Sequence, residues 1–213
     1  MTHRPEAPDV GLRARLPFEC PPQLIAALRS TYAVPPRAYH NFSHVEEVLG
    51  HMASAPRWSD PASVALAILF HDAIYEAGKP DNEARSAQLA EVQINAHLPA
   101  WVARITRVRE LILLTARHGR LSRGDVDPDA AMFLDCDMAV LGAEPTRYAH
   151  YERAIADEYS AVPPELYRVG RAQFLQAVLT KPNIYLSPWF QARFELRARE
   201  NLAAALRELE GQT

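Results

Sequence analysis

Apolar residues recur along most of the chain at the three- and four-residue spacing that places them on one face of a helix. The stretch 24–28 follows this spacing directly after Pro21 and Pro22, so a first helix is expected to open at these prolines. A shorter helix is expected from about Ser43 to Ala53. No stretch shows the convincing alternation of a half-buried strand, and the pattern therefore predicts an all-α protein.

One segment, 64–70, is apolar at every position. It follows Asp60 and Pro61, a capping side chain and a first-turn proline, which together predict the start of a helix. A helix without a polar face is buried on all sides. Because this segment leads directly into His71 and Asp72, it predicts two polar side chains at the end of a buried helix.

Capping residues and first-turn prolines mark the start of most later helices. These helices are expected near Asp81, Pro99, Pro128, Pro145, Pro164 and Pro188. The last stretch, 189–210, has an apolar stripe opposite Arg and Glu side chains. Without an internal repeat or a break in composition, the pattern predicts one compact multi-helix domain over 1–213, of about nine helices, with an irregular segment over about 1–20.

The composition narrows the classes of partner and compartment. The chain has 213 residues, of which 48% are hydrophobic and 23% charged, as in ordinary globular domains. Its net charge of −3 disfavours a nucleic-acid polymer as partner. There is neither a signal-peptide pattern nor an apolar run long enough for a bilayer, and Cys20 and Cys136 suggest no disulfide framework. We expect a cytoplasmic monomer or homodimer without a membrane partner.

His71 and Asp72 are the first candidates for chemistry. An ionised Asp at the end of a buried helix is costly unless it is paired or bound to a metal. An imidazole and a carboxylate side by side suit Mn²⁺, Fe²⁺, Zn²⁺ or Mg²⁺. The purely structural alternative is a His stabilised by the helix dipole beside a solvated Asp.

Two further groups stand in apolar surroundings. His40 and His44 are four residues apart and would share one face of a helix, although each could be a histidine satisfied by a hydrogen bond. Asp135 and Asp137 interrupt the apolar stretch 133–141. Two residues apart, they point about 200° from each other on a helix, so one could be a ligand while the other caps or pairs.

The order His, His-Asp, Asp resembles the HD-domain superfamily of metal-dependent phosphohydrolases. Longer motifs spread over roughly residues 20–207 resemble a bacterial subgroup of predicted HD phosphohydrolases. These motifs are Tyr39-His-Asn-Phe-Ser-His44, Ala67-Ile-Leu-Phe-His-Asp-Ala-Ile-Tyr75, Asp81-Asn-Glu-Ala-Arg-Ser86, Phe133-Leu-Asp-Cys-Asp-Met-Ala-Val-Leu-Gly142 and Tyr167-Arg-Val-Gly-Arg171. The resemblance implies an all-α fold around a divalent metal ion.

The resemblance also implies the ligands of that ion. They are His44, His71, Asp72 and Asp137, with Asp135 as the alternative to Asp137. We choose Asp137 because it directly precedes Met-Ala-Val-Leu, an apolar turn typical of the superfamily's last Asp. One divalent ion is expected, with Mn²⁺, Mg²⁺, Fe²⁺, Co²⁺, Ni²⁺ and Zn²⁺ as the candidates.

Residues near this set are candidates for catalysis and substrate binding. Besides Asp72, His40 and Glu83 could orient a water molecule or accept its proton, although Glu83 also suits the first turn of a helix. Basic and polar side chains could bind the phosphate group. The substrate-binding candidates are Asn82, Arg117, His118 and Arg171.

The expected activity is hydrolysis of a small phosphate ester, either a monoester or a diester, with nucleotides among the candidates. The motifs of P-loop proteins, of dinucleotide-binding folds and of serine esterases are absent. Two alternatives stay open. One is a metal-dependent nucleotide sensor without turnover, and the other is a di-iron oxygenase on the same fold.

Overall fold

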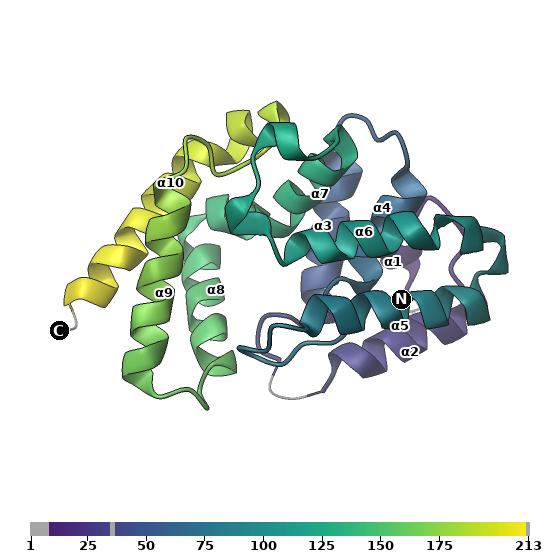
Figure 1. Ribbon diagram of the computed structural model, residues 1–213, viewed down its shortest axis with the longest axis horizontal. Coiled ribbons are helices and arrows are strands. Elements are labelled where there is room, and N and C mark those ends of the chain that lie inside the picture. The colour runs from purple at the N-terminus through teal and green to yellow at the C-terminus, as the bar shows by residue number, and fades with distance from the viewer. Residues whose placement is uncertain (1–8, 35–36, 212–213) are drawn as a thin grey trace, which may run out of the picture. The chain divides into compact units, whose positions relative to one another are not determined.

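The computed structural model describes residues 9–34 and 37–211 (Figure 1). In these residues every regular element is a helix: there are ten α-helices and four short 3₁₀ helices, and no strand. The prediction of an all-α protein is therefore confirmed. Within the same residues, no helix combines the length and the apolar character that crossing a bilayer requires.

The chain divides into two compact units. The first comprises Met1–Val34 and His40–Ala116, and the second comprises Pro35–Tyr39 and Arg117–Thr213. The chain thus passes briefly through the second unit before it returns to the first. The expectation of one domain over 1–213 stays a prediction.

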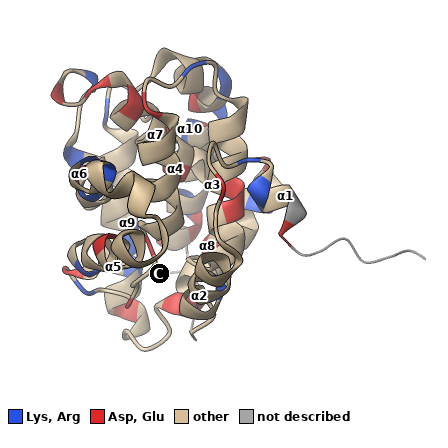
Figure 2. Cartoon of the chain, turned by 90° about the vertical axis from the view of Figure 1, so that its right-hand side faces the viewer, with Lys and Arg blue, Asp and Glu red and all other residues tan. Residues whose placement is uncertain are grey.

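The first unit holds the helices up to residue 116. They are α1 (Val10–Arg13), α2 (Pro22–Tyr32), α3 (Phe42–Ser54), α4 (Pro61–Phe70), α5 (Asn82–His97), the 3₁₀ helix η1 (Pro99–Arg104) and α6 (Ile105–Thr115). Helix α4 contacts α3, α5 and α6 and so forms the centre of this unit. Figure 2 shows acidic and basic residues along α5, and none of its charged residues, Glu83, Arg85 and Glu91, is buried.

Helix α4 starts and is buried as its sequence predicts. The carboxylate of Asp60 accepts a hydrogen bond of 3.1 Å from the Ser63 N–H, and Pro61 occupies the first turn. Every residue from Ala62 to Phe70 is buried. Burial of so many apolar side chains stabilises the helix that directly precedes His71.

Helix α3 is built in the same way but keeps one polar face. The side chain of Asn41 caps it by accepting a hydrogen bond of 2.9 Å from the Ser43 N–H. Its bounds, Phe42–Ser54, differ by one residue at each end from the prediction. The buried face carries apolar residues and a single imidazole, that of His44.

The second unit is formed by the rest of the chain. Its elements are the 3₁₀ helices η2 (His118–Arg120), η3 (Arg123–Asp125) and η4 (Met138–Gly142) and the α-helices α7 (Pro128–Asp137), α8 (Pro145–Glu158), α9 (Pro164–Leu179) and α10 (Pro188–Gly211). Helix α10 packs beside α9 (Figure 1) and against η4. At this contact a Cβ atom on Gly142 would lie 2.7 Å from the Cβ atom of Phe194, which explains the glycine.

Tyr39, which belongs to the second unit, contacts α8 of that unit through its backbone and its ring. Its N–H donates a hydrogen bond of 2.8 Å to the carboxylate of Glu158, a buried residue at the end of α8. The ring of Tyr39 also packs edge-on against that of Tyr151, with 4.7 Å between the centroids.

Two predictions about the segments between the long helices differ from the structure. Part of the expected irregular segment 1–20 forms α1, while 1–8 lie outside the described residues. The helix expected from Pro99 begins as the 3₁₀ turn of η1, and α6 follows it.

Candidate metal centre

The orientation of the His71 ring is fixed by its own helix. Its Nδ1 atom lies 2.9 Å from the carbonyl oxygen of Ile68, and the residue is buried. Because a carbonyl oxygen can only accept, the proton of a neutral His71 ring sits on Nδ1, and its Nε2 atom carries the lone pair. A backbone contact of this kind is how proteins commonly orient a metal-binding histidine.

Two other side chains of the first unit converge on this Nε2 atom. The Nε2 atom of His44 lies 3.2 Å from that of His71. A carboxylate oxygen of Asp72 lies 3.1 Å from the His71 Nε2 atom and 3.6 Å from that of His44. The sequence separates His44 from the other two residues, and the packing of α3 against α4 brings them together.

This donor set fits a divalent metal ion. The three residues each offer one ligand atom, and these atoms lie within 4.8 Å of one another. A lone pair on His71 that faces another imidazole nitrogen needs either a proton or a cation on the side between them. Two imidazoles and a carboxylate are ligands that Mn²⁺, Fe²⁺, Co²⁺, Ni²⁺ and Zn²⁺ accept. His44, His71 and Asp72 could therefore hold a metal ion.

Asp137 belongs to the second unit and lies at the end of α7. Its carboxylate oxygen is 3.6 Å from the Nδ1 atom of His118, whose Nε2 atom lies 3.1 Å from the carbonyl oxygen of Leu134. The proton of a neutral His118 ring therefore sits on Nε2, and its Nδ1 lone pair faces a carboxylate. A second proton on the ring or a nearby cation would satisfy both groups.

Asp135, the alternative ligand, is engaged elsewhere in the second unit. One carboxylate oxygen accepts a hydrogen bond of 2.7 Å from the Leu186 N–H, and the other accepts one of 2.7 Å from the Ser187 N–H. Burial raises the pKa of this carboxyl group to about 6, although the hydrogen bonds from Ser187 and Leu186 act in the opposite direction. Asp135 thus anchors the segment that leads into α10.

His40, the expected catalytic histidine, lies just before Asn41 and therefore outside α3. Its ring is stacked on the ring of Tyr75, with the centroids 3.9 Å apart and an angle of 24° between the planes. It also lies edge-on to His44, at 6.0 Å between centroids. Glu83, the other candidate, occupies the first turn of α5, where the helix dipole favours a negative charge.

Asn82 uses its side chain inside a loop. The amide nitrogen donates to the carbonyl oxygens of Glu76 and Lys79 at 2.9 and 3.3 Å, and the amide oxygen accepts from the Glu76 N–H at 3.0 Å. Both protons of the amide and its oxygen are therefore occupied. The expectation that Asn82 binds substrate stays a prediction, but these contacts give it a role in holding the loop.

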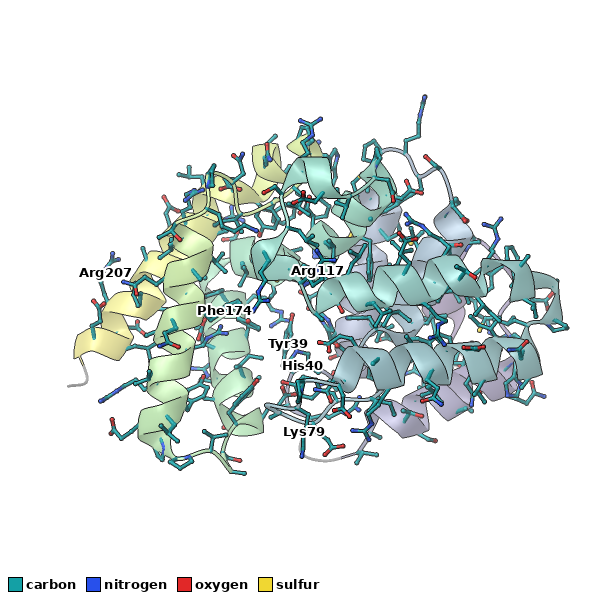
Figure 3. All side chains as sticks on the ribbon, in the orientation of Figure 1. Tyr39, His40, Lys79, Arg117, Phe174 and Arg207 are labelled. Carbon is teal, nitrogen blue, oxygen red and sulfur yellow. The ribbon has the colours of Figure 1, made fainter. Side chains whose placement is uncertain are left out.

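The two arginines expected to bind substrate lie in different surroundings. Arg171 is buried, and its guanidinium contacts both carboxylate oxygens of Glu152, at 3.1 and 2.7 Å. It also lies over the ring of Phe174, at 4.8 Å from the centroid. Arg117, by contrast, is exposed at the start of the second unit (Figure 3). Arg117 is thus the arginine whose charge is accessible to an anion.

Sequence reasoning gave no role to Tyr75 and Ser86, although both lie inside the motifs that carry the resemblance. Tyr75 follows Asp72 by three residues, and Ser86 follows Asn82 by four. Polar residues four apart lie on one face of a helix. The spacing of Asn82 and Ser86 could therefore have indicated that both side chains contact the same neighbouring segment.

Comparison with known proteins adds no family to these observations. No protein-family model matches the chain, and no curated protein and no solved structure matches it either.

Proposed function

We propose that the chain is a metal-dependent phosphohydrolase that acts on a small phosphate ester. One observation carries this proposal: at the end of a buried helix, the Nε2 atom of His71 lies 3.2 Å from that of His44 and 3.1 Å from the carboxylate of Asp72. The resemblance of the sequence motifs to HD-type phosphohydrolases supports the same assignment.

The proposed ligands are His44, His71, Asp72 and Asp137. Asp137 is preferred to Asp135 because both oxygens of Asp135 accept backbone hydrogen bonds. A single divalent ion is proposed, from the series Mn²⁺, Mg²⁺, Fe²⁺, Co²⁺, Ni²⁺ and Zn²⁺. When bound, such an ion would supply a Lewis acid for a phosphoryl oxygen and would lower the pKa of a water molecule.

The protein's own residues would keep the donors in the required state. The Ile68 carbonyl oxygen holds the proton of His71 on Nδ1 and so leaves the Nε2 lone pair available. The carboxylate of Asp72 contributes negative charge, which stabilises a bound cation. These contacts come from one helix end, and they favour a site that is preorganised before the ion arrives.

In the proposed reaction, a water oxygen forms a new bond to phosphorus while the bond to the leaving oxygen breaks. His40 accepts the proton of the attacking water, with Glu83 as the second candidate. The leaving oxygen takes up a proton from solvent. Arg117 would balance the negative charge of the phosphoryl group, because its guanidinium is exposed. Nucleotides are among the proposed substrates.

The first test is calorimetric titration of metal-stripped protein with Mn²⁺. Wild type is expected to bind about one ion, and Asp72→Asn is expected to lose this binding because it removes the negative charge of the ligand. Asp157→Asn, which changes a carboxylate on α8 in the second unit, serves as the matched control and should bind like wild type. If wild type binds none of Mn²⁺, Fe²⁺ and Zn²⁺ in this titration, the proposed metal site is wrong.

A phosphate-release screen then tests the activity. Wild type loaded with Mn²⁺ is expected to release phosphate from p-nitrophenyl phosphate or from one of the nucleoside monophosphates, and Asp72→Asn should not. Tight nucleotide binding without turnover would instead favour the sensor. Iron-dependent consumption of O₂ would favour the oxygenase.

A further inference from the structure

The stacked pair His40 and Tyr75 lies beside the proposed metal ligands. His40 lies two residues before the first residue of α3, Phe42. The ring of Tyr75 covers one of its faces, at 3.9 Å between the centroids. The ring of His40 is in turn edge-on to His44, at an angle of 76°. A change in the His40 ring plane would therefore change how its nitrogen atoms are presented next to His44.

The backbone on both sides of Tyr75 is held by α5. The hydroxyl of Ser86 accepts a hydrogen bond of 3.0 Å from the Ile74 N–H and donates one of 3.1 Å to the Ile74 carbonyl oxygen. The amide of Asn82 makes the equivalent pair with Glu76, accepting at 3.0 Å and donating at 2.9 Å. Both residues that flank Tyr75 are thus bound through their N–H and their carbonyl group.

The two side chains that hold this segment are themselves fixed. Asn82 and Ser86 are four residues apart on α5, so they share one face of the helix. Both are buried, and a buried polar group that loses its partner is strongly unfavourable. The backbone of residues 74–76 therefore has little conformational freedom. A tyrosine on a fixed backbone has only a few side-chain rotamers, which limits where its ring can lie.

We propose that Tyr75 is a positioning residue: α5, through Asn82 and Ser86, fixes the Tyr75 backbone, and the Tyr75 ring sets the plane of the His40 imidazole. The inference rests on the role proposed above for His40 as acceptor of the water proton. It assigns a task to the motif at the start of α5. Asn82 acts through the backbone of Glu76 and holds the loop rather than the substrate.

The variants Tyr75→Phe and Tyr75→Leu separate the ring from the hydroxyl group. Phenylalanine keeps the stacked ring, whereas leucine removes it. The matched control is Phe18→Leu, which removes another partly exposed aromatic ring of the first unit, one that contacts Trp101 at 5.3 Å. Ser86→Ala is a second route to the same effect, because it frees Ile74 without touching either ring.

The first readout is the NMR spectrum of the metal-free protein, with the His40 ring protons assigned by comparison with His40→Gln. Protons over the face of an aromatic ring are shielded by its ring current. In Tyr75→Leu these signals should move downfield, and in Tyr75→Phe they should stay near their wild-type positions. Ser86→Ala should move them in the same direction as Tyr75→Leu, and Phe18→Leu should leave them unchanged.

The second readout is phosphate release with Mn²⁺ and p-nitrophenyl phosphate. Tyr75→Leu is expected to lower kcat by about tenfold, within the roughly hundredfold that a misplacement of about 1 Å can produce. Its Mn²⁺ affinity and its KM should stay close to wild type. Tyr75→Phe should restore kcat, since it restores the stack.

Unmoved His40 signals in both Tyr75→Leu and Ser86→Ala would overturn the positioning role, whatever the activity. A kcat of Tyr75→Leu equal to that of Phe18→Leu would overturn it as well. If wild type releases no phosphate, the proposed function fails. In that case the His40 signals alone still decide whether Tyr75 sets the plane of this ring.

Discussion

The Nε2 atoms of His44 and His71 lie 3.2 Å apart, although His44 lies in α3 and His71 directly follows α4. The contact between His71 Nδ1 and the Ile68 carbonyl oxygen leaves a lone pair on the His71 side of this gap. An arrangement of this kind is stabilised by a positive charge placed between the rings. Metal binding and protein stability should therefore be linked at this position.

A ligand that binds only the folded state stabilises it, by about 2.7 kcal/mol at a hundredfold excess over its Kd. We expect saturating Mn²⁺ to raise the melting temperature of wild type and to have no such effect on His71→Gln. Differential scanning fluorimetry with and without the ion measures this difference. His97→Gln, at the C-terminal end of α5, is the control and should respond like wild type. An equal response of His71→Gln would remove His71 from the ligand set.

The two aspartates at the end of α7 should respond differently to the same substitution. Asp137→Asn is expected to lose Mn²⁺ affinity while its free energy of unfolding stays close to wild type. Asp135→Asn should instead be destabilised by about 1–3 kcal/mol, because its new NH₂ group faces the N–H donor of Leu186 or Ser187. Urea unfolding and calorimetry on both variants separate the two roles. The reverse pattern would make Asp135 the ligand.

The buried thiol of Cys20 should be almost unreactive in the folded protein. Burial raises its pKa to about 11 from an ordinary value of 9.0, so at pH 8 its thiolate fraction is about a hundredfold lower than in an unfolded chain. We expect the iodoacetamide labelling rate, followed by mass spectrometry, to rise about tenfold per pH unit up to about pH 11.

The raised pKa of Cys20 also determines how the stability of the folded protein changes with pH. The folded pKa lies above the unfolded one, so the neutral thiol is favoured in the folded state. This contribution is complete below about pH 9 and is lost as the pH rises through about 11. The control is protein in concentrated urea, where labelling should level off near pH 9. Rapid labelling of the folded protein at pH 8 would contradict the burial of Cys20.

Gly142 should not tolerate a side chain. A Cβ atom there would lie 2.7 Å from both the Cβ atom and the carbonyl oxygen of Phe194, and a backbone atom cannot move aside easily. We expect Gly142→Ala to be destabilised by about 1–3 kcal/mol in urea unfolding.

Gly170 provides the matched control for this substitution. It lies inside α9, and nothing lies within 4 Å of the Cβ position that alanine would add. Alanine is a better helix former, so Gly170→Ala should be stabilised by about 0.5–1 kcal/mol. Destabilisation by Gly170→Ala as large as that by Gly142→Ala would show that the close approach to Phe194 is not the cause.

The helices could be predicted well because their causes are local. Asp60 and Pro61 mark the start of α4, and its unbroken apolar sequence predicts its full burial. The helix expected from about Ser43 to Ala53 is α3, whose bounds differ from the prediction by one residue at each end. By contrast, η1 was predicted as part of a longer helix, because the change from 3₁₀ to α geometry at Ile105 leaves no capping residue in the sequence.

The candidate site could be predicted only as far as its residues lie in recognisable motifs. His44, His71 and Asp72 were expected together, and the first unit brings them together. The motif favoured Asp137 but left Asp135 as an alternative, because the partners of Asp135 lie about fifty residues further along the chain.

The sequence pattern also did not indicate which residues the charged and polar side chains contact. The expectation for Arg171 rested on its charge alone, whereas Glu152 on another helix occupies that charge in the structure. Tyr75 was overlooked for the same reason, since its contact with His40 joins residues that are separated by α3 and α4. Tertiary contacts of this kind cannot be read from periodicity.

Tyr39 belongs to the second unit although it precedes most of the first unit in sequence. This order limits how the protein can be divided into fragments. A fragment that starts at Arg117 contains Glu158 and Tyr151 but lacks the residue whose N–H and ring they contact. A fragment that stops at Ala116 carries Tyr39 without those partners. No single peptide bond therefore separates the two compact units cleanly. Recombination at residue 116 would join two incomplete pieces, whereas the second unit expressed alone would need residues 35–39 supplied as a separate peptide or through a new linker.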